Sequence, residues 1–244
     1  MSTARKSVVF LALAFAISWG VTLGGVALGF NATAVGAFWT LFAMMFGPSI
    51  AAAICVFSFE RGRVREALGL RWTPNWWWLW AWFGAFLLCA LAIVFTVASG
   101  HSGLADPAQA VIAQAAAANP ATAAQLRAIP LDLILVAQAA VLGSLINIPT
   151  LVFTEELGWR GYLHFLWRPG GFWRTSLATG VIWGVWHAPA IYFYGLNYPD
   201  HRDIGIPIFI GFCTLLAPIM TFLRDRGRSV IAPAILHGMI NATA

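Results

Sequence analysis

The sequence predicts an all-α fold, a polytopic bundle of about seven transmembrane helices whose N-terminus is cytoplasmic. Of the 244 residues, 60% are hydrophobic and only 9% are charged, whereas soluble domains have roughly 45–50% apolar and about 25% charged residues. The apolar residues form long runs without charge, and Lys and Arg form short clusters between these runs. This pattern excludes an ordinary soluble protein, and the lack of a continuous basic stripe argues against a nucleic-acid partner.

The individual spans follow from the length of each apolar run, because a helix needs about 20 apolar residues to cross a bilayer. Five runs are long enough, and two further runs are shorter. The five are residues 7–30, 35–58, 76–99, 133–153 and 204–223, and the shorter two are 175–194 and 229–244.

The orientation follows from the basic residues, because cytoplasmic loops carry an excess of Lys and Arg. With the N-terminus inside, all of the 14 Lys and Arg residues except Arg127 and Arg202 lie on or near the cytoplasmic side. The Trp residues around positions 72–82 and 167–173 then lie at the same interface, where aromatic residues are enriched. We therefore expect an integral membrane protein that has the lipid bilayer as its surroundings.

The segment from about residue 100 to 129 is rich in Ala and contains Pro107 and Pro120. We expect it to be an outer loop with at most one surface helix. No linker divides the chain, so we expect one integrated membrane domain. Within it, residues 1–130 form the N-terminal helices and this outer loop, and residues 131–244 form a second membrane region.

Charged residues interrupt the apolar sequence at Glu155, Glu156 and Arg160, although hydrophobic residues resume directly afterwards. Ionisable groups within a membrane are costly and usually mark a functional pathway. On an α-helix Glu156 and Arg160 share a face and can form an ion pair, whereas Glu155 lies about 100° round the helix and is left free. We expect Glu156 to be a structural partner of Arg160 and Glu155 to act as a base. An interfacial cluster that merely ends a helix is the alternative.

The helix that carries these residues is too long for one crossing, because residues 131–167 would span about 55 Å as an α-helix. We therefore expect a kink at Pro149, or a break near Gly158 and Gly161. Either would keep the carboxylates below the membrane surface.

Two later spans also contain polar residues at depth. His187 lies near the middle of the run 175–194, and His237 and Asn241 lie four residues apart in the last run. A single buried His is usually structural, but polar groups on three segments are best satisfied by one shared hydrated cavity. The other three histidines, His101, His164 and His201, fall in loops or at interfaces, and we leave them outside the site.

A carboxylate, two imidazoles and an amide can hold a water molecule, take its proton and stabilise an oxyanion. This combination indicates hydrolysis of an amide. The same Glu and His residues could also bind zinc, which lowers the pKa of a bound water to about 7. The residues leave the metal-free and the zinc-assisted routes open.

The ordered motifs Glu155-Glu156-x-x-x-Arg160, Trp183-x-x-x-His187 and His237-x-x-x-Asn241 resemble the signature of the CAAX-protease and bacteriocin-processing (CPBP) family of intramembrane proteases. The resemblance covers about residue 133 to the chain end. It implies a helical bundle with a polar cavity open to the cytoplasm and, for bacterial members, a place in the inner (plasma) membrane. Trp183 stands where Phe is more usual in the family.

The resemblance also implies roles for the site residues. Glu155 would be the base, His187 would help to activate water, and His237 and Asn241 would stabilise the oxyanion. Glu156 and Arg160 would be supporting residues.

The leading hypothesis is an intramembrane endopeptidase that cleaves a peptide or a lipidated protein substrate. The alternative is a non-catalytic membrane scaffold or bacteriocin self-immunity protein of the same fold. A transporter with a proton relay is a third possibility, but the sequence shows no inverted repeat.

Overall fold

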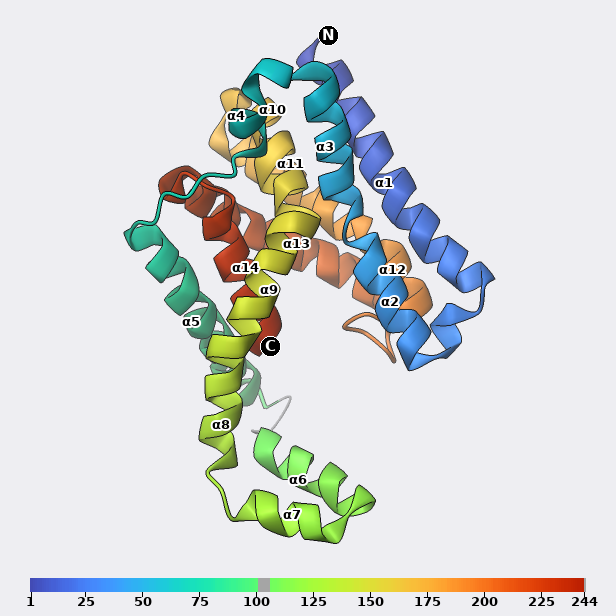
Figure 1. Cartoon of the computed structure of the whole chain (residues 1–244), viewed down its shortest axis with the longest axis vertical. Helices are drawn as coiled ribbons and strands as arrows, with labels where there is room; N and C mark the ends of the chain where they lie inside the picture. Colours follow the sequence, from blue (N-terminus) through green and yellow to red (C-terminus); the bar gives the residue numbers. More distant parts are fainter. Residues whose placement is uncertain (101–105, 244) are drawn as a thin grey trace. The chain divides into compact units, whose positions relative to one another are not determined.

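The computed structural model describes residues 1–100 and 106–243, and all regular elements in them are helical. The all-α prediction is therefore confirmed (Figure 1). The chain forms two compact units, which we describe separately. Unit 1 comprises Met1–Trp78 and Thr150–Ala234, and unit 2 comprises Leu79–Pro149 and Ile235–Ala244.

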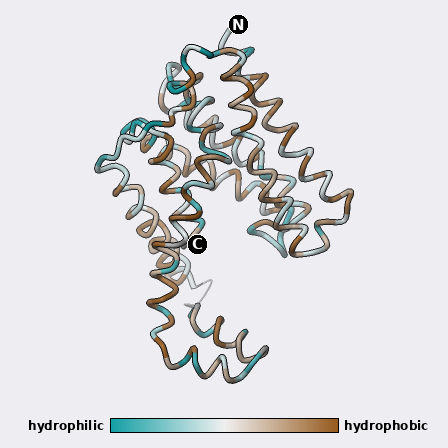
Figure 2. Tube along the Cα trace, viewed as in Figure 1, coloured by the Kyte–Doolittle hydropathy of each residue, from teal (hydrophilic) through white to brown (hydrophobic). Residues whose placement is uncertain are grey.

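Within the described residues, 5 helical segments are long and apolar enough to cross a membrane. Figure 2 shows their predominantly hydrophobic colouring. They match the five long runs predicted from the sequence, whereas the two shorter predicted spans correspond to shorter helices. The five are α1 (Thr3–Ala27), the pair α2 (Ala34–Met44) and α3 (Gly47–Phe59), α5 (Trp76–Ala98), the segment Leu131–Gly170, and α13 (Arg202–Gly227).

The two shorter predicted spans are divided differently. Residues 175–194 fall in α11 (Phe172–Trp186) and α12 (Ala188–Tyr194), which His187 separates. The last run contains α14 (Ile231–Thr243). The total of about seven spans therefore stays a prediction.

Helices in unit 1 pack closely through glycine. The helix α1 packs on α2 and α3, α3 packs on the segment around Glu155, and α11 packs on α13. A Cβ atom on Gly180 would lie 2.7 Å from Thr214 Cα, and one on Gly184 would lie 2.5 Å from Ile210 Cα. Only a residue without a side chain allows the α11 and α13 backbones to approach so closely.

The segment Leu131–Gly170 remains helical throughout, so the expected break near Gly158 and Gly161 is wrong. Both glycines instead allow close packing in unit 1, because a Cβ on Gly158 would lie 2.6 Å from Pro48 Cβ and one on Gly161 would lie 2.6 Å from Leu68 O. The helix is π-type in two stretches. Its parts are α8 (Leu131–Gln138), π-helix η3 (Ala139–Gly143), α9 (Ser144–Leu151), π-helix η4 (Val152–Leu163), α10 (His164–Trp167) and the 3₁₀ turn η5 (Arg168–Gly170).

Pro149 lies inside α9 and directly precedes the boundary between the two units. The kink predicted there stays a prediction. Three short elements complete unit 1: the 3₁₀ turns η1 (Phe30–Ala32) and η2 (Arg61–Arg63), and α4 (Val64–Leu68).

The Ala-rich segment contains two helices, α6 (Pro107–Ala118) and α7 (Pro120–Arg127), so the prediction of a loop with at most one helix is wrong. Part of that prediction falls on residues 101–105, which lie outside the described residues. The error comes from interpreting proline as a helix breaker. Asp106 caps the Gln109 N–H at 3.1 Å and Asn119 caps the Ala121 N–H at 2.9 Å, so each proline follows an N-cap and starts a helix.

A small apolar cluster holds these helices together in unit 2. It consists of Ala108, Ile112, Ala123 and Leu131. The part of α14 in this unit approaches α9, where Asn147 Nδ2 donates to Gly238 O at 3.4 Å. A Cβ on Gly238 would lie 3.0 Å from Ile148 N, so this contact also depends on glycine.

Candidate active site

Trp183 on α11 is the centre of the predicted site in unit 1. The indole is 1% exposed, and its Nε1–H donates to Glu155 Oε2 at 2.7 Å. Glu155 lies on η4 and is itself buried. The N–H therefore stabilises the ionised carboxylate, because hydrogen bonds to a charged acceptor are stronger than neutral ones.

The predicted pair of Glu156 and Arg160 is present. Arg160 Nη1 donates to Glu156 Oε1 at 3.0 Å, and both side chains are buried. The Arg160 guanidinium carbon lies 4.2 Å from the centroid of the Trp183 ring, which is a cation–π contact. Burial and this second contact set the pair apart from an exposed ion pair on a helix surface.

The expectation that Glu155 is left free is wrong, because its carboxylate accepts from the same indole that Arg160 contacts. The reason is the π-helix η4, which spans Val152–Leu163. A π-helix forms i→i+5 hydrogen bonds and has more residues per turn than an α-helix. Residues five apart therefore come closer to alignment, and Glu155 and Arg160 are five apart.

His187 follows the last residue of α11, and its Nδ1 lies 2.8 Å from Trp183 O. A carbonyl oxygen only accepts, so Nδ1 carries the proton and donates. Nε2 is then the ring nitrogen that can take a proton or bind a metal. The imidazole is 7% exposed and packs edge-on against Trp186 and Phe209, with centroids 4.6 and 4.7 Å away. These rings fix its orientation.

A second polar group supports the η4 backbone from α13. Arg224 Nε donates to Arg160 O at 2.8 Å. Beside it, Asp225 accepts from His164 Nε2 at 3.0 Å and from Arg168 Nε at 2.8 Å. His164 is buried, and nothing in the sequence near it indicated Asp225 as a partner. His101 lies outside the described residues.

His237 and Asn241 both lie on α14, four residues apart, in unit 2. His237 is buried and Asn241 is exposed. The predicted convergence of these two residues with Glu155 and His187 of unit 1 stays a prediction. Unit 1 does bring together four of the six predicted site residues, namely Glu155, Glu156, Arg160 and His187, around Trp183.

A metal centre requires several ligands in one place. Within the described ranges, no three His, Cys, Asp or Glu side chains are grouped so that they could hold a metal ion. Glu155 and His187 provide two such groups in unit 1. Zinc therefore stays an expectation from the sequence.

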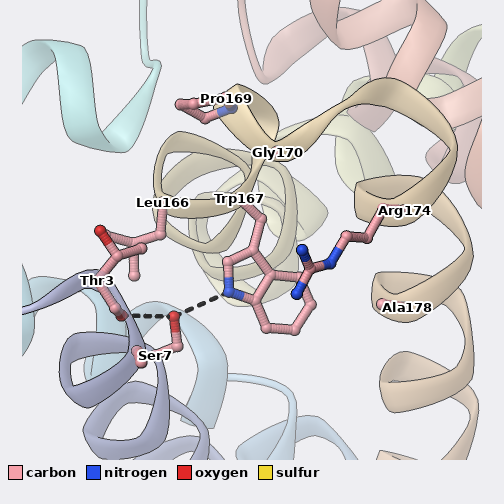
Figure 3. Close-up of a pocket in the computed structure, with 9 residues that line it drawn as sticks. Thr3, Ser7, Leu166, Trp167, Pro169, Gly170, Arg174 and Ala178 are labelled. Atoms are coloured by element: carbon pink, nitrogen blue, oxygen red, sulfur yellow. Dashed lines mark hydrogen bonds between the residues drawn. The ribbon is translucent and has the colours of Figure 1, made fainter.

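A cavity of about 620 Å³ lies elsewhere in unit 1, between the start of α1 and the turn that leads into α11 (Figure 3). Its wall includes Ser7, Trp167 and Arg174, and none of the predicted site residues lines it.

Residues 137–243 match the family described as Type II CAAX prenyl endopeptidase Rce1-like. This region of the chain is similar to that family. The match contains all six predicted site residues, and it confirms the resemblance to CPBP proteases. It also agrees with the apolar helices, so the chain is an integral membrane protein.

A relative from Methanococcus maripaludis, described as CAAX prenyl protease 2, is 30% identical over 92 residues. These residues are 36% of the present chain and 34% of the relative, so the similarity spans about a third of that protein. No solved structure matches the chain.

Trp183 is the residue whose function sequence reasoning missed. Its ring was noted only as a bulkier substitute for Phe, although the indole N–H is a hydrogen-bond donor that Phe lacks. The sequence did show an indole N–H donor at Trp183, in the apolar span that also contains His187. It also showed two carboxylates, at positions 155 and 156, that could accept from this donor.

Proposed function

We propose that the protein is an intramembrane endopeptidase that hydrolyses a peptide bond of a membrane-associated substrate, either a CAAX-like lipidated protein or a peptide of the bacteriocin type. The observation that carries the proposal is the convergence of Glu155 and His187 on Trp183 inside an Rce1-like region. A buried carboxylate and a buried imidazole that both hydrogen-bond to one residue are groups suited to moving a proton to and from a reacting water. Both groups are held by hydrogen bonds before substrate arrives.

In this proposal Glu155 takes a proton from water, and the water oxygen attacks the carbonyl carbon of the substrate. His187 orients the water through Nε2. The C–N bond then breaks, and the proton passes from Glu155 to the leaving amine nitrogen. The products are a carboxylic acid and an amine, which exchange a proton to give a carboxylate and an ammonium group. His237 and Asn241 are assigned to the developing oxyanion, which donors of this kind stabilise.

Glu156 and Arg160 are assigned a supporting role. Arg160 lies between the Glu156 carboxylate and the Trp183 ring. Its charge therefore helps to hold η4 against α11, the two elements that carry Glu155 and His187.

These residue roles are compatible with a metal-free route and with a zinc-assisted one. Zinc bound by Glu155 and His187 with a further ligand would lower the pKa of water and polarise the carbonyl. Metal analysis of the purified protein and assay with a chelator decide between the routes. Cleavage that survives chelation would favour the metal-free route, and a loss that added zinc restores would favour the metal-assisted route.

We further propose that the protein lies in the inner (plasma) membrane of a bacterium, with its cleavage site on the cytoplasmic side. The basic residues predicted on that side support this orientation.

The test is proteolysis by the full chain reconstituted in liposomes, with a fluorescence-quenched peptide that ends in a prenylated CAAX sequence and the same peptide without the prenyl group. Glu155→Gln and His187→Ala should each reduce kcat by about 10²–10⁴-fold, the usual value of a general acid or base. Glu66→Gln is the matched control, because Glu66 is exposed on α4.

Two outcomes would contradict the proposal. Cleavage at the wild-type rate by Glu155→Gln would remove Glu155 as the base. No cleavage of either peptide by the wild type, together with an unchanged cellular phenotype in Glu155→Gln, would favour the non-catalytic scaffold.

A further inference from the structure

Three interactions of the predicted site meet at one residue, Trp183. The indole N–H binds Glu155, the indole face lies against Arg160, and the main-chain carbonyl accepts from His187. A phenylalanine here would keep the ring face and the carbonyl, and would lose only the N–H. The hydrogen bond to Glu155 is therefore the contribution that is specific to tryptophan.

This hydrogen bond is not a general consequence of burying tryptophan in this region. Trp159 and Trp186 are also fully buried, and their Nε1 atoms have no hydrogen-bond partner within the described residues. Trp159 contacts Trp186 and Phe10 edge-on, and so takes part in packing alone. Trp183 differs because its N–H is directed at a carboxylate.

We propose that Trp183 is a positioning residue that orients the Glu155 carboxylate for proton transfer, an inference that rests on the proposed function. One carboxylate oxygen is fixed by the indole N–H at 2.7 Å. Fixing one oxygen restricts rotation of the carboxylate and sets the direction in which its other oxygen takes a proton. Catalysis depends on such orientation, since a small misplacement of a reacting group is costly.

The experiment compares Trp183→Phe with Trp159→Phe, because both changes remove the same atoms from a buried ring. Trp183→Phe should lower kcat roughly tenfold or more, which corresponds to about 1.4 kcal/mol, and leave KM within about twofold. Trp159→Phe should leave kcat within about twofold. Unfolding of both variants in detergent reports any general loss of stability.

A spectroscopic readout tests the contact without any substrate. The indole ¹⁵N–H resonances of Trp183 and Trp159 are assigned in micelles from their loss in the two Phe variants. Glu155→Gln should shift the Trp183 resonance and leave that of Trp159 in place. An unmoved Trp183 resonance, or equal kcat values in the two Phe variants, would overturn the positioning role.

Failure of the proposed function gives a different result from failure of the positioning role alone. It would show as a wild type that cleaves neither peptide, whatever the resonances do, and the positioning role would fall with it.

A second inference comes independently from the cavity of about 620 Å³ in Figure 3. Its wall is mostly apolar, and includes Leu166 and Ala178. Trp167 presents its ring, because its Nε1–H donates to Ser7 Oγ at 2.8 Å. Arg174 extends toward Trp167 in Figure 3 and is exposed.

The charge balance of this region favours an anion. Two neighbouring cations are neutralised, since Lys6 pairs with Glu60 and Arg168 pairs with Asp225. Arg174 has no carboxylate partner among the described residues. An exposed cation in the wall of an apolar cavity is suited to a molecule with an anionic end and an apolar body.

We infer that this cavity holds the phosphate end of an anionic phospholipid. The sequence places these residues at the cytoplasmic interface, where lipid phosphates lie and where Arg and Trp are enriched. The apolar wall would cover the glycerol and the first part of an acyl chain, and Arg174 would bind the phosphate.

Native mass spectrometry with phosphatidylglycerol, phosphatidylcholine or inorganic phosphate tests this site. Arg174→Gln should weaken phosphatidylglycerol binding about fivefold, as expected for one interfacial cation, and Ala178→Trp should block it. Arg127→Gln removes an exposed charge from unit 2 and should have no effect. Equal binding by wild type and Arg174→Gln would overturn the inference, and so would binding of inorganic phosphate that matches that of the lipid.

Discussion

The buried pair of Glu156 and Arg160 gives a prediction whose magnitude follows from burial. The two side chains are 0% and 1% exposed, and one hydrogen bond of 3.0 Å joins them. Replacing Glu156 by Ala leaves the guanidinium buried without this carboxylate. Breaking a buried pair in this way costs about 3–5 kcal/mol. The Trp183 ring face remains against Arg160, and such a contact contributes about 2 kcal/mol when desolvated, so we expect the lower end of that range.

The double substitution Glu156→Leu with Arg160→Met should behave differently. It removes both charges and keeps apolar volume, and exchanges of this kind are neutral or stabilising by about 1–4 kcal/mol in other proteins. We therefore expect the double variant to be more stable than the single variant Glu156→Ala. The assay is equilibrium unfolding in mixed micelles, with circular dichroism and tryptophan fluorescence as probes.

The reasoning fails if Glu156→Ala unfolds within about 1 kcal/mol of the wild type, a cost typical of an exposed pair. It also fails if the double variant is the less stable of the two. Peptide cleavage by the double variant shows whether the pair also contributes to catalysis. A stable but inactive protein would show that the pair serves catalysis by holding η4, whereas an active one would limit its role to folding.

Three further predictions use the same unfolding assay. Gly184→Ala should destabilise the protein by about 1–3 kcal/mol, because the new Cβ would meet Ile210 Cα at 2.5 Å; Gly20→Ala, which meets nothing within 4 Å, should be neutral or stabilising. Asp225→Asn should destabilise by about 1–3 kcal/mol, since two donors lose a charged acceptor. The hydrogen bond from Arg63 lowers the pKa of Glu66, so any stabilisation by this pair is present at neutral pH and is lost as the pH falls, but solvent screening keeps it small. Because the pair is exposed, Glu66→Gln should leave the free energy of unfolding at pH 7 unchanged within error. Equal losses of stability in all of these variants would contradict these predictions.

Hydropathy and spacing predicted much of this molecule because a bilayer constrains a chain strongly. Five long apolar runs correspond to five long helical segments, since span length is set by membrane thickness. The pair of Glu156 and Arg160 was predictable because two opposite charges one turn apart have few other partners in an apolar span. In residues 107–127 the secondary structure depends instead on local capping. Asp106 is the N-cap, so Pro107 takes the first helical position and starts a helix.

Partners distant in sequence were not predictable from one chain. His164 meets Asp225 on another helix, and Gly161 meets Leu68. Each contact depends on how two helices cross, which periodicity within either helix does not determine. The same holds for the indole of Trp183, whose acceptor is 28 residues away on a different element.

The π-helix η4 explains why the contacts of Glu155 differ from those expected for an α-helix. Sequence reasoning assumed about 100° per residue and therefore separated Glu155 from Arg160. With i→i+5 hydrogen bonds over Val152–Leu163, the two residues approach one side of the helix, and one indole contacts both. π-Helical turns are rare and occur often at functional sites. An α-helical segment of the same sequence would keep the pair of Glu156 and Arg160 but would turn Glu155 away from Trp183. The wider turn is thus what brings Glu155, as well as Arg160, to the indole of Trp183 next to His187.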